Sequence, residues 1–169
     1  MGETQFLQFL GEYGLWFLFI IVFMEYLNLP GFPSGIIMPV AGMWASDRSV
    51  LFFILALLVS VVAGVLGSQI LYFIGKIGGK PLLDKIYSKN SKYSNKLKEV
   101  EIKMNKNAFK TVFIFKLIPV LRTLIGFPAG AIKMKTSIYL SSTTLGVTIW
   151  NSIYMLTGTA LWQIIGKFF

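Results

Sequence analysis

The sequence predicts an all-α integral membrane protein in which a re-entrant hairpin followed by a transmembrane helix occurs twice, as an inverted repeat. Hydrophobic residues make up 55% of the 169-residue chain and charged residues only 14%, which is too little charge for the surface of a soluble domain. No charged residue lies between Arg48 and Lys76, or between Lys135 and Lys167, and about 20 apolar residues suffice to span a bilayer. A third observation is that a Gly-Phe-Pro-small-Gly turn is written twice within apolar surroundings.

The first repeat begins with a hairpin over residues 13–46, preceded by an interfacial helix over residues 1–12. The first limb, YGLWFLFIIVFM, makes only ~18 Å of helix against a ~30 Å hydrocarbon core. The tip, EYLNLPGFPSG, cannot continue a helix, and a second short limb, IIMPVAGMWAS, follows it. Two half-length limbs indicate a re-entrant hairpin, which a transmembrane helix over residues 50–75 follows. The residues that break the tip are Pro30, Gly31, Pro33 and Gly35.

The second repeat has the same plan. A hairpin over residues 108–135 consists of the limb AFKTVFIFKLI, the broken tip PVLRTLIGFPAG and a brief exit. A transmembrane helix over residues 136–158 follows, and residues 159–169 form a short apolar tail. Together the elements make one membrane domain over residues 1–169. The residues that break the second tip are Pro119, Gly126, Pro128 and Gly130.

The linker over residues 76–110 predicts the orientation. It holds ten Lys against Asp84, Glu99 and Glu101, so we expect a basic amphipathic segment that lies on the membrane surface against anionic headgroups. The positive-inside rule places this linker in the cytoplasm. The two hairpins then enter the membrane from opposite faces, which makes the repeats inverted.

The broken tips predict a substrate site. Non-helical backbone within a bilayer is tolerated only where protein buries it or water reaches it. Inverted repeats whose broken helices meet near the midplane are typical of secondary transporters, with the site at the repeat interface. The alternative is that each turn packs helices together and binds no ligand.

Two charges of opposite sign, Glu25 and Arg122, fall in corresponding parts of the two tips. A charge at the centre of a membrane helix costs roughly 2.5–3.5 kcal/mol on insertion scales, so such residues pair or line a hydrated cavity. We therefore expect these two to approach each other near the middle of the bilayer. The planar guanidinium suits phosphate, and free N–H groups at the tips also favour an anion. The predicted substrate-binding residues are Glu25, Arg122, Lys116, Ser34, Gly35 and Gly126.

In this interpretation Arg122 binds an anionic headgroup, Lys116 is a second cation, and Glu25 is the counter-charge when the site is empty. Two alternatives remain open. Glu25 and Arg122 could form a structural ion pair, or their side chains could extend to opposite membrane–water interfaces. Lys116 taken alone would be an anchor that reaches the interface.

Several function classes are disfavoured by composition. The chain has no Cys and no His, so it lacks thiol chemistry, the usual general base and the commonest metal ligand, and we expect no metal, no cofactor and no enzyme activity. Pro33-Ser34-Gly35 is similar to the PSGH element of lipid phosphatases, but Ile36 stands where the His would be. A serine protease needs a basic partner for its Ser, and no Ser–Lys pair shares a tip. We expect no nucleic-acid binding, because the linker lysines lack Arg and stacked aromatic residues.

Three segments together resemble the DedA family of membrane proteins, which shares its core with VTT-domain lipid scramblases. They are Glu25 with LPGFPSGIIMPVAG, GVLGSQILYFIGKIGGK, and FKLIPVLRTLIGFPAGAIKM, and the resemblance covers about residues 13–158. It implies opposed re-entrant hairpins, lipid translocation, and functional roles for Glu25 and Arg122. For bacterial members it implies recycling of undecaprenyl phosphate or movement of phosphatidylethanolamine. The most specific motif, F-x-x-x-P-x-x-R-x-x-x-G-x-P-A-G, is met by Phe115, Pro119, Arg122, Gly126, Pro128, Ala129 and Gly130.

The chain departs from the family pattern in three places. Lys116 stands where the family has its first arginine. The family's second acid, in a Pro-Gly-Asp/Glu element, has no match, because the chain reads Pro33-Ser34-Gly35 there. Ser68 stands where members often have Asp. Glu25 is then the only carboxylate left within the hydrocarbon, which favours facilitated, scramblase-like movement.

The expected function is that of a flippase which moves undecaprenyl phosphate across the bacterial cytoplasmic membrane, as a multi-pass protein. One alternative is a phosphatidylethanolamine scramblase or floppase, in which Arg122 binds the phosphate and Glu25 binds the amine. Another is a non-transporting organiser of a membrane complex that docks through the linker. Proton or sodium coupling and homo-oligomer formation stay open.

Overall fold

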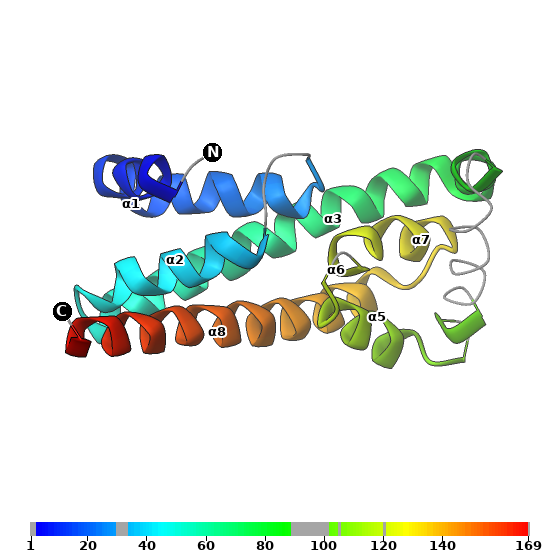
Figure 1. The fold of residues 1–169 in the computed structure, drawn as a ribbon. Coiled ribbons are helices and arrows are strands. Elements are labelled where there is room, and N and C mark those ends of the chain that lie inside the picture. Colours follow the sequence, from blue (N-terminus) through cyan, green and yellow to red (C-terminus); the bar gives the residue numbers. More distant parts are fainter. Residues whose placement is uncertain (1–2, 30–33, 89–101, 105, 120, 169) are drawn as a thin grey trace. The chain divides into compact units, whose positions relative to one another are not determined.

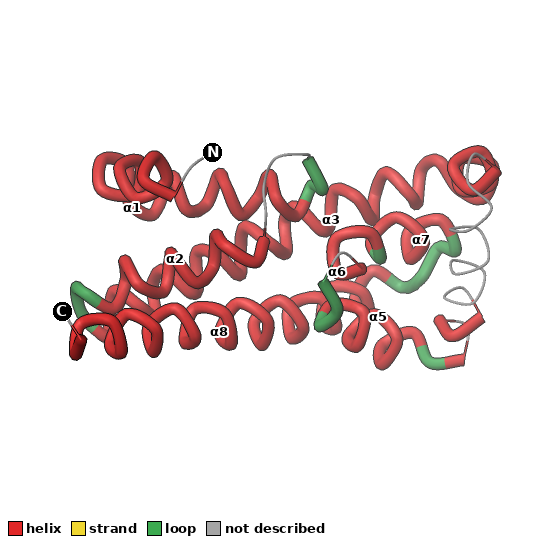
Figure 2. The backbone as a smooth tube through the Cα atoms, viewed as in Figure 1, coloured by secondary structure: helices red, strands yellow, loops and turns green. Residues whose placement is uncertain are grey.

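The computed structural model describes residues 3–29, 34–88, 102–104, 106–119 and 121–168. These residues are helical, with short connections and no strand among them (Figure 2). The all-α class predicted from the sequence is therefore confirmed. The labelled helices are α1 (Glu3–Tyr26), α2 (Ser34–Ser46), α3 (Val50–Ser88), α5 (Ala108–Lys116), α6 (Leu121–Leu124), α7 (Gly126–Ala131) and α8 (Thr136–Phe168).

The chain divides into two compact units. Unit 1 comprises Met1–Gly64 and Thr148–Phe169, and unit 2 comprises Val65–Val147. Helices α1 and α2 belong to unit 1, and α5, α6 and α7 belong to unit 2 (Figure 1). The two long helices α3 and α8 each contribute residues to both units, so each unit combines one predicted hairpin region with parts of both long helices.

Two glycines with positive φ interrupt helices α1 and α3. Gly14 (φ 59°) interrupts α1, and Gly79 (φ 58°) interrupts α3 two residues before Pro81. Glycine adopts this conformation without a steric penalty, and proline disfavours continuation of the preceding turn. Helix α1 ends at Tyr26, and Asn28 (φ 60°) then takes the left-handed conformation that is common after helix ends.

Two prolines of the hairpin regions lie inside helices. Pro39 lies within α2, and Pro128 lies in the first turn of α7. In the first turn of a helix the missing N–H has no intrahelical partner to lose. The second tip therefore resumes helical structure at Gly126, before its proline. Pro30, Gly31 and Pro33 of the first tip lie outside the described residues.

One helix among the described residues, Val50–Gly79, is long and apolar enough to cross a membrane, with 30 residues. The apolar helices Tyr13–Tyr26 and Gly35–Ser46 are shorter. Helix α8 contains the predicted second span, but Ser and Thr recur along it and Asn151 lies among them. The second span thus stays a prediction of the sequence.

In unit 1, α2 and α8 approach each other closely at two glycines. A Cβ atom at Gly42 would overlap the main-chain oxygen of Met155, and one at Gly158 would overlap that of Pro39. Small residues let helix backbones come this close within membranes. Because the later residue of α2 meets the earlier residue of α8, the two helices run antiparallel at this contact.

In unit 2, α7 and α3 make the same kind of contact. A Cβ atom at Gly130 would overlap the main-chain oxygen of Tyr72, and one at Gly75 would overlap that of Phe127. Gly75 of α3 faces Phe127, and Tyr72, which comes earlier in α3, faces Gly130, so these two helices also run antiparallel at the contact. Each unit therefore contains one reciprocal pair of glycines, in which each helix supplies a glycine and a carbonyl. We call these two contacts the glycine crossings.

The glycine crossings do not follow the register of the repeated pentapeptide. GFPSG ends at Gly35 and GFPAG ends at Gly130, but the residue that packs like Gly130 is Gly42, about two helical turns after Gly35. Gly35 itself is exposed, and no heavy atom lies within 4 Å of a Cβ placed there. The last glycines of two turns that are nearly identical in sequence thus make different contacts.

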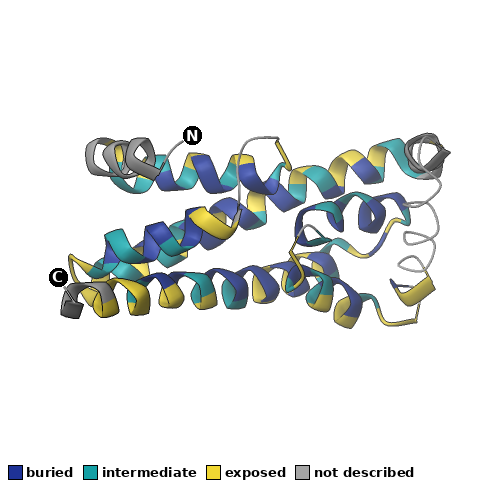
Figure 3. Ribbon diagram, viewed as in Figure 1, coloured by how far each residue is buried: buried dark blue, intermediate teal, exposed yellow. Residues whose placement is uncertain are grey.

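Burial differs between the inner and outer faces of the helices (Figure 3). Trp16, Val50 and Ile77 are between 78% and 88% exposed, as expected for side chains that face lipid rather than water. The core of unit 2 is formed by one cluster of buried side chains, and partly buried residues pack against it. The cluster consists of Tyr72, Met104, Val112, Ile125, Ala129, Met134 and Tyr139.

Candidate functional site

Lys116 is the polar centre of unit 2. It is the last residue of α5 and is 1% exposed. Its Nζ donates hydrogen bonds of 2.8 Å to Ser68 Oγ and of 2.8 Å to the main-chain oxygen of Arg122. The aliphatic stem lies against Gly146 of α8, where a Cβ atom would overlap Lys116 Cβ. One side chain thus connects α5 to α3 and α6 while it packs against α8.

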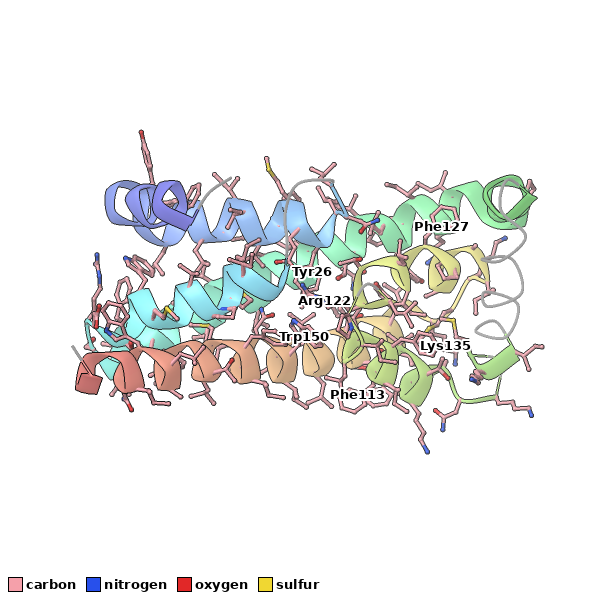
Figure 4. All side chains as sticks on the ribbon, viewed as in Figure 1. Tyr26, Phe113, Arg122, Phe127, Lys135 and Trp150 are labelled. Carbon is pink, nitrogen blue, oxygen red and sulfur yellow. The ribbon has the colours of Figure 1, made fainter. Side chains whose placement is uncertain are left out.

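Arg122 is also 1% exposed and is carried by the short helix α6 (Figure 4). The turn that contains Pro119 separates α6 from α5, and the Arg122 N–H donates to the Ile118 main-chain oxygen at 3.0 Å. A guanidinium has five N–H donors in a fixed plane and keeps its charge at any physiological pH. A buried arginine on a broken segment of an apolar unit is therefore suited to bind an anion such as phosphate.

Two tyrosines support this part of unit 2. Tyr139 Oη donates to the main-chain oxygen of Ser68 at 3.2 Å, and its ring stacks on Tyr72 with the centroids 4.6 Å apart. Lys116 Nζ lies 5.8 Å from the centroid of the Tyr139 ring, within the range of a cation–π interaction. A Cβ atom at Gly126 would lie 2.8 Å from Tyr139 Oη, so Gly126 is required here for close packing.

Unit 1 holds a separate group of buried polar side chains. Glu25 is 3% exposed and precedes Tyr26, the last residue of α1. Tyr26 Oη donates to Asn151 Oδ1 at 3.3 Å, and Asn151 Nδ2 donates to Ser60 Oγ at 3.1 Å. These bonds connect α1, α8 and α3 within unit 1, so the backbone next to Glu25 is fixed by a buried hydrogen-bond chain.

The predicted site residues are distributed over the two units. Lys116, Arg122 and Gly126 come together in unit 2, where each lies next to Ser68 or to another member of the group. Glu25 lies in unit 1. Gly35 is exposed at the start of α2.

Ser34 begins α2, and its side chain lies outside the described residues.

Several polar residues of these groups are not among the predicted site residues, including Ser68, Tyr139 and Asn151. Ser68 was noted only as a departure from the family pattern. A signal for Ser68 was present in its spacing, since Ser68 and Tyr72 lie four residues apart and share one face of a helix. Asn151 is an isolated amide in an apolar helix, which is costly in a membrane unless it is bonded.

Among the described residues, no group of three or more His, Cys, Asp or Glu side chains is placed so that it could hold a metal ion. The polar chemistry found in unit 2 is that of an ammonium, a guanidinium and hydroxyl groups. Groups of this kind are suited to bind and orient an anion.

The comparisons with known proteins fit this chemistry. Residues 32–160 match the family model of the VTT domain. The chain is 33% identical over 159 residues to undecaprenyl phosphate transporter A of Staphylococcus aureus, covering 91% of this chain and 77% of that protein.

Two further relatives extend the comparison. The chain is 31% identical to an alkaline phosphatase-like protein of Lactococcus lactis, covering 94% of this chain and 77% of that protein. It is 25% identical to protein DedA of Escherichia coli, covering 92% of this chain and 74% of that protein. No solved structure matches the chain significantly.

Proposed function

Because this chain belongs to the VTT domain (DedA) family of membrane proteins, we propose that it moves undecaprenyl phosphate across the cytoplasmic membrane. The coarse role, transport of a lipid carrier, is supported by the relatives named undecaprenyl phosphate transporter A in Staphylococcus aureus and Bacillus subtilis, at 33% and 31% identity. The observation that carries the proposal is the buried guanidinium of Arg122 on the broken segment of unit 2.

In the proposed mechanism Arg122 binds the lipid phosphate through two parallel N–H···O bonds. The prenyl tail stays in the hydrocarbon, and the hairpins rearrange so that the headgroup is released on the other side. Such transport needs only a site that binds the headgroup and can release it. No covalent step occurs, which agrees with a chain that has neither His nor Cys.

Glu25 is proposed as the counter-charge of the empty site. Its 3% exposure supports a role inside the protein rather than at an interface, because a buried carboxylate must be compensated. Glu25 lies in unit 1 and Arg122 in unit 2, and their pairing stays a prediction of the sequence.

We also propose the membrane topology that the sequence predicts: two re-entrant hairpins, inverted with respect to each other, a second span in α8 and a cytoplasmic Lys-rich linker. The glycine crossings support the repeat, since each unit packs a hairpin helix against a long helix in the same reciprocal way. The linker side chains over residues 82–101 lie outside the described residues.

A zwitterionic phospholipid is the second candidate substrate. A buried carboxylate favours it, because Glu25 could bind the amine of phosphatidylethanolamine while Arg122 binds the phosphate. The two substrates differ in what they require of Glu25. A phosphomonoester needs no carboxylate contact, whereas an amine headgroup loses its partner in Glu25→Gln.

The test is transport by the purified protein in liposomes that contain undecaprenyl phosphate and phosphatidylethanolamine, with native mass spectrometry of co-purified lipids. We expect transbilayer movement of undecaprenyl phosphate above protein-free liposomes, and we expect that lipid to co-purify. Movement of phosphatidylethanolamine alone, lost in Glu25→Gln, supports the second candidate. Movement of neither lipid contradicts the proposed function.

A further inference from the structure

The side chain of Lys116 is held on several sides by the protein. An ammonium has three N–H donors, and Lys116 Nζ directs two of them at Ser68 Oγ and the Arg122 main-chain oxygen, each at 2.8 Å. Both distances lie at the short end of the range for N–H···O bonds. The stem is confined against Gly146, where no side chain larger than glycine fits without displacing it. This ammonium is therefore fixed in place before any ligand binds.

The bond to the Arg122 main-chain oxygen is important because α6 is short. With residues 121–124 alone, a single helical turn has few internal hydrogen bonds to hold its backbone. A bond from a charged donor is about twice as strong as one between neutral groups. Lys116 thus restrains the backbone at Arg122, from which the guanidinium side chain extends.

Ser68 completes the arrangement from α3. It is 1% exposed, its Oγ accepts from Lys116, and its main-chain oxygen accepts from Tyr139 Oη. Without the hydroxyl acceptor the ammonium would keep the Arg122 bond but lose its second anchor. Of these two hydrogen bonds, only the one to the Arg122 main-chain oxygen would then hold the ammonium.

We propose that Ser68 and Lys116 are positioning residues for Arg122, and that Lys116 orients the arginine rather than serving as the second phosphate ligand. This rests on the proposed function only in assigning phosphate binding to Arg122. The two hydrogen bonds of Lys116 connect Ser68 of α3 with Arg122 of α6, and all three residues belong to unit 2. Through these bonds Ser68 determines the affinity for the headgroup, although Ser68 does not contact the headgroup.

The first readout does not depend on transport. Arg48 and Arg122 are the only arginines in the chain, so in an Arg48→Lys background the guanidinium Nε–H signal in a ¹⁵N NMR spectrum belongs to Arg122. We expect Ser68→Ala and Lys116→Met to shift this signal, and the double variant to match Lys116→Met alone. The control is Ser142→Ala, because Ser142 is equally buried and its hydroxyl bonds only within its own helix.

The second readout is the apparent KM for undecaprenyl phosphate in liposomes. We expect Ser68→Ala to raise it by about 10-fold, since a hydrogen bond to a charged group is lost, with the melting temperature close to that of Ser142→Ala. In the Lys116→Met background, Ser68→Ala should have no further effect. Rescue by Ser68→Thr, which keeps the hydroxyl, is expected.

The outcomes separate the two proposals. An Arg122 signal that is unchanged in Ser68→Ala, or a full effect of Ser68→Ala in the Lys116→Met background, overturns the positioning role. If the wild-type protein moves no undecaprenyl phosphate but the Arg122 signal responds as expected, the proposed function fails and the positioning role stands.

Discussion

The Nζ atom of Lys116 donates a hydrogen bond of 2.8 Å to the main-chain oxygen of Arg122, six residues later. The bond spans the turn that contains Pro119 and joins the end of α5 to the short helix α6. The structure thereby distinguishes the two buried cations, Lys116 and Arg122. The Lys116 ammonium donates its hydrogen bonds to protein atoms, and one of the acceptors is the main-chain oxygen of Arg122.

The glycine crossings should be sensitive to a single added methyl group. In Gly130→Ala and in Gly42→Ala the new Cβ overlaps a backbone oxygen of the facing helix, so the helices must separate. We expect destabilisation of roughly 1–3 kcal/mol, as for other overpacked sites, measured by thermal unfolding in detergent. Gly35→Ala is the matched control, because no heavy atom lies within 4 Å of its Cβ. If Gly130→Ala has the same melting temperature as Gly35→Ala, the glycine crossing in unit 2 is contradicted.

The hydrogen-bond chain beside Glu25 can be tested by a double-mutant cycle. Asn151→Leu removes the acceptor of Tyr26 Oη and the donor to Ser60 Oγ, and Tyr26→Phe removes one of the same bonds. We expect the two changes to be less than additive in unfolding free energy, with a coupling of roughly 0.6–1.7 kcal/mol, the range for hydrogen bonds within membrane proteins. Strict additivity would show that Tyr26 and Asn151 do not interact.

The Lys-rich linker should contribute little to transport itself. If Lys89, Lys92, Lys96 and Lys98 act only on anionic headgroups, their replacement by Gln weakens the interaction of the linker with phosphatidylglycerol headgroups in proteoliposomes, by ~1 kcal/mol per lysine near the surface. Lipid movement by the reconstituted protein should stay within about twofold of wild type, because the phosphate is bound elsewhere. Loss of function in these variants together with normal function in Arg122→Ala favours the alternative of a non-transporting organiser.

Much of the fold could be predicted from local sequence. The helical class follows from composition, and the break between α5 and α6 follows from Pro119. The break points within helices were harder to predict. Gly14 and Gly79 interrupt helices, whereas Gly75 stays helical and packs against α7. An isolated glycine tolerates both states, and its packing partners decide between them.

The site was predictable only in part. Glu25 and Arg122 were identified because a charge in an apolar segment is costly, which is a local signal. The contact between Ser68 and Lys116 joins residues 48 positions apart on different helices, so no local spacing reveals it. The repeated pentapeptide marks two regions of the sequence, but its register does not give the contacts, because Gly42 rather than Gly35 makes the crossing in unit 1.

The most direct test of phosphate binding by Arg122 is the rate of undecaprenyl phosphate movement by Arg122→Lys in liposomes. Lysine keeps the positive charge but loses the planar pair of donors, and Arg48→Lys, which changes an exposed arginine, serves as the control. We expect Arg48→Lys to transport normally and Arg122→Lys to fall by about 10-fold or more, the loss expected when a charge-assisted bidentate contact is removed. Transport at the full wild-type rate in both Arg122→Lys and Arg122→Ala would contradict a role of this guanidinium in phosphate binding.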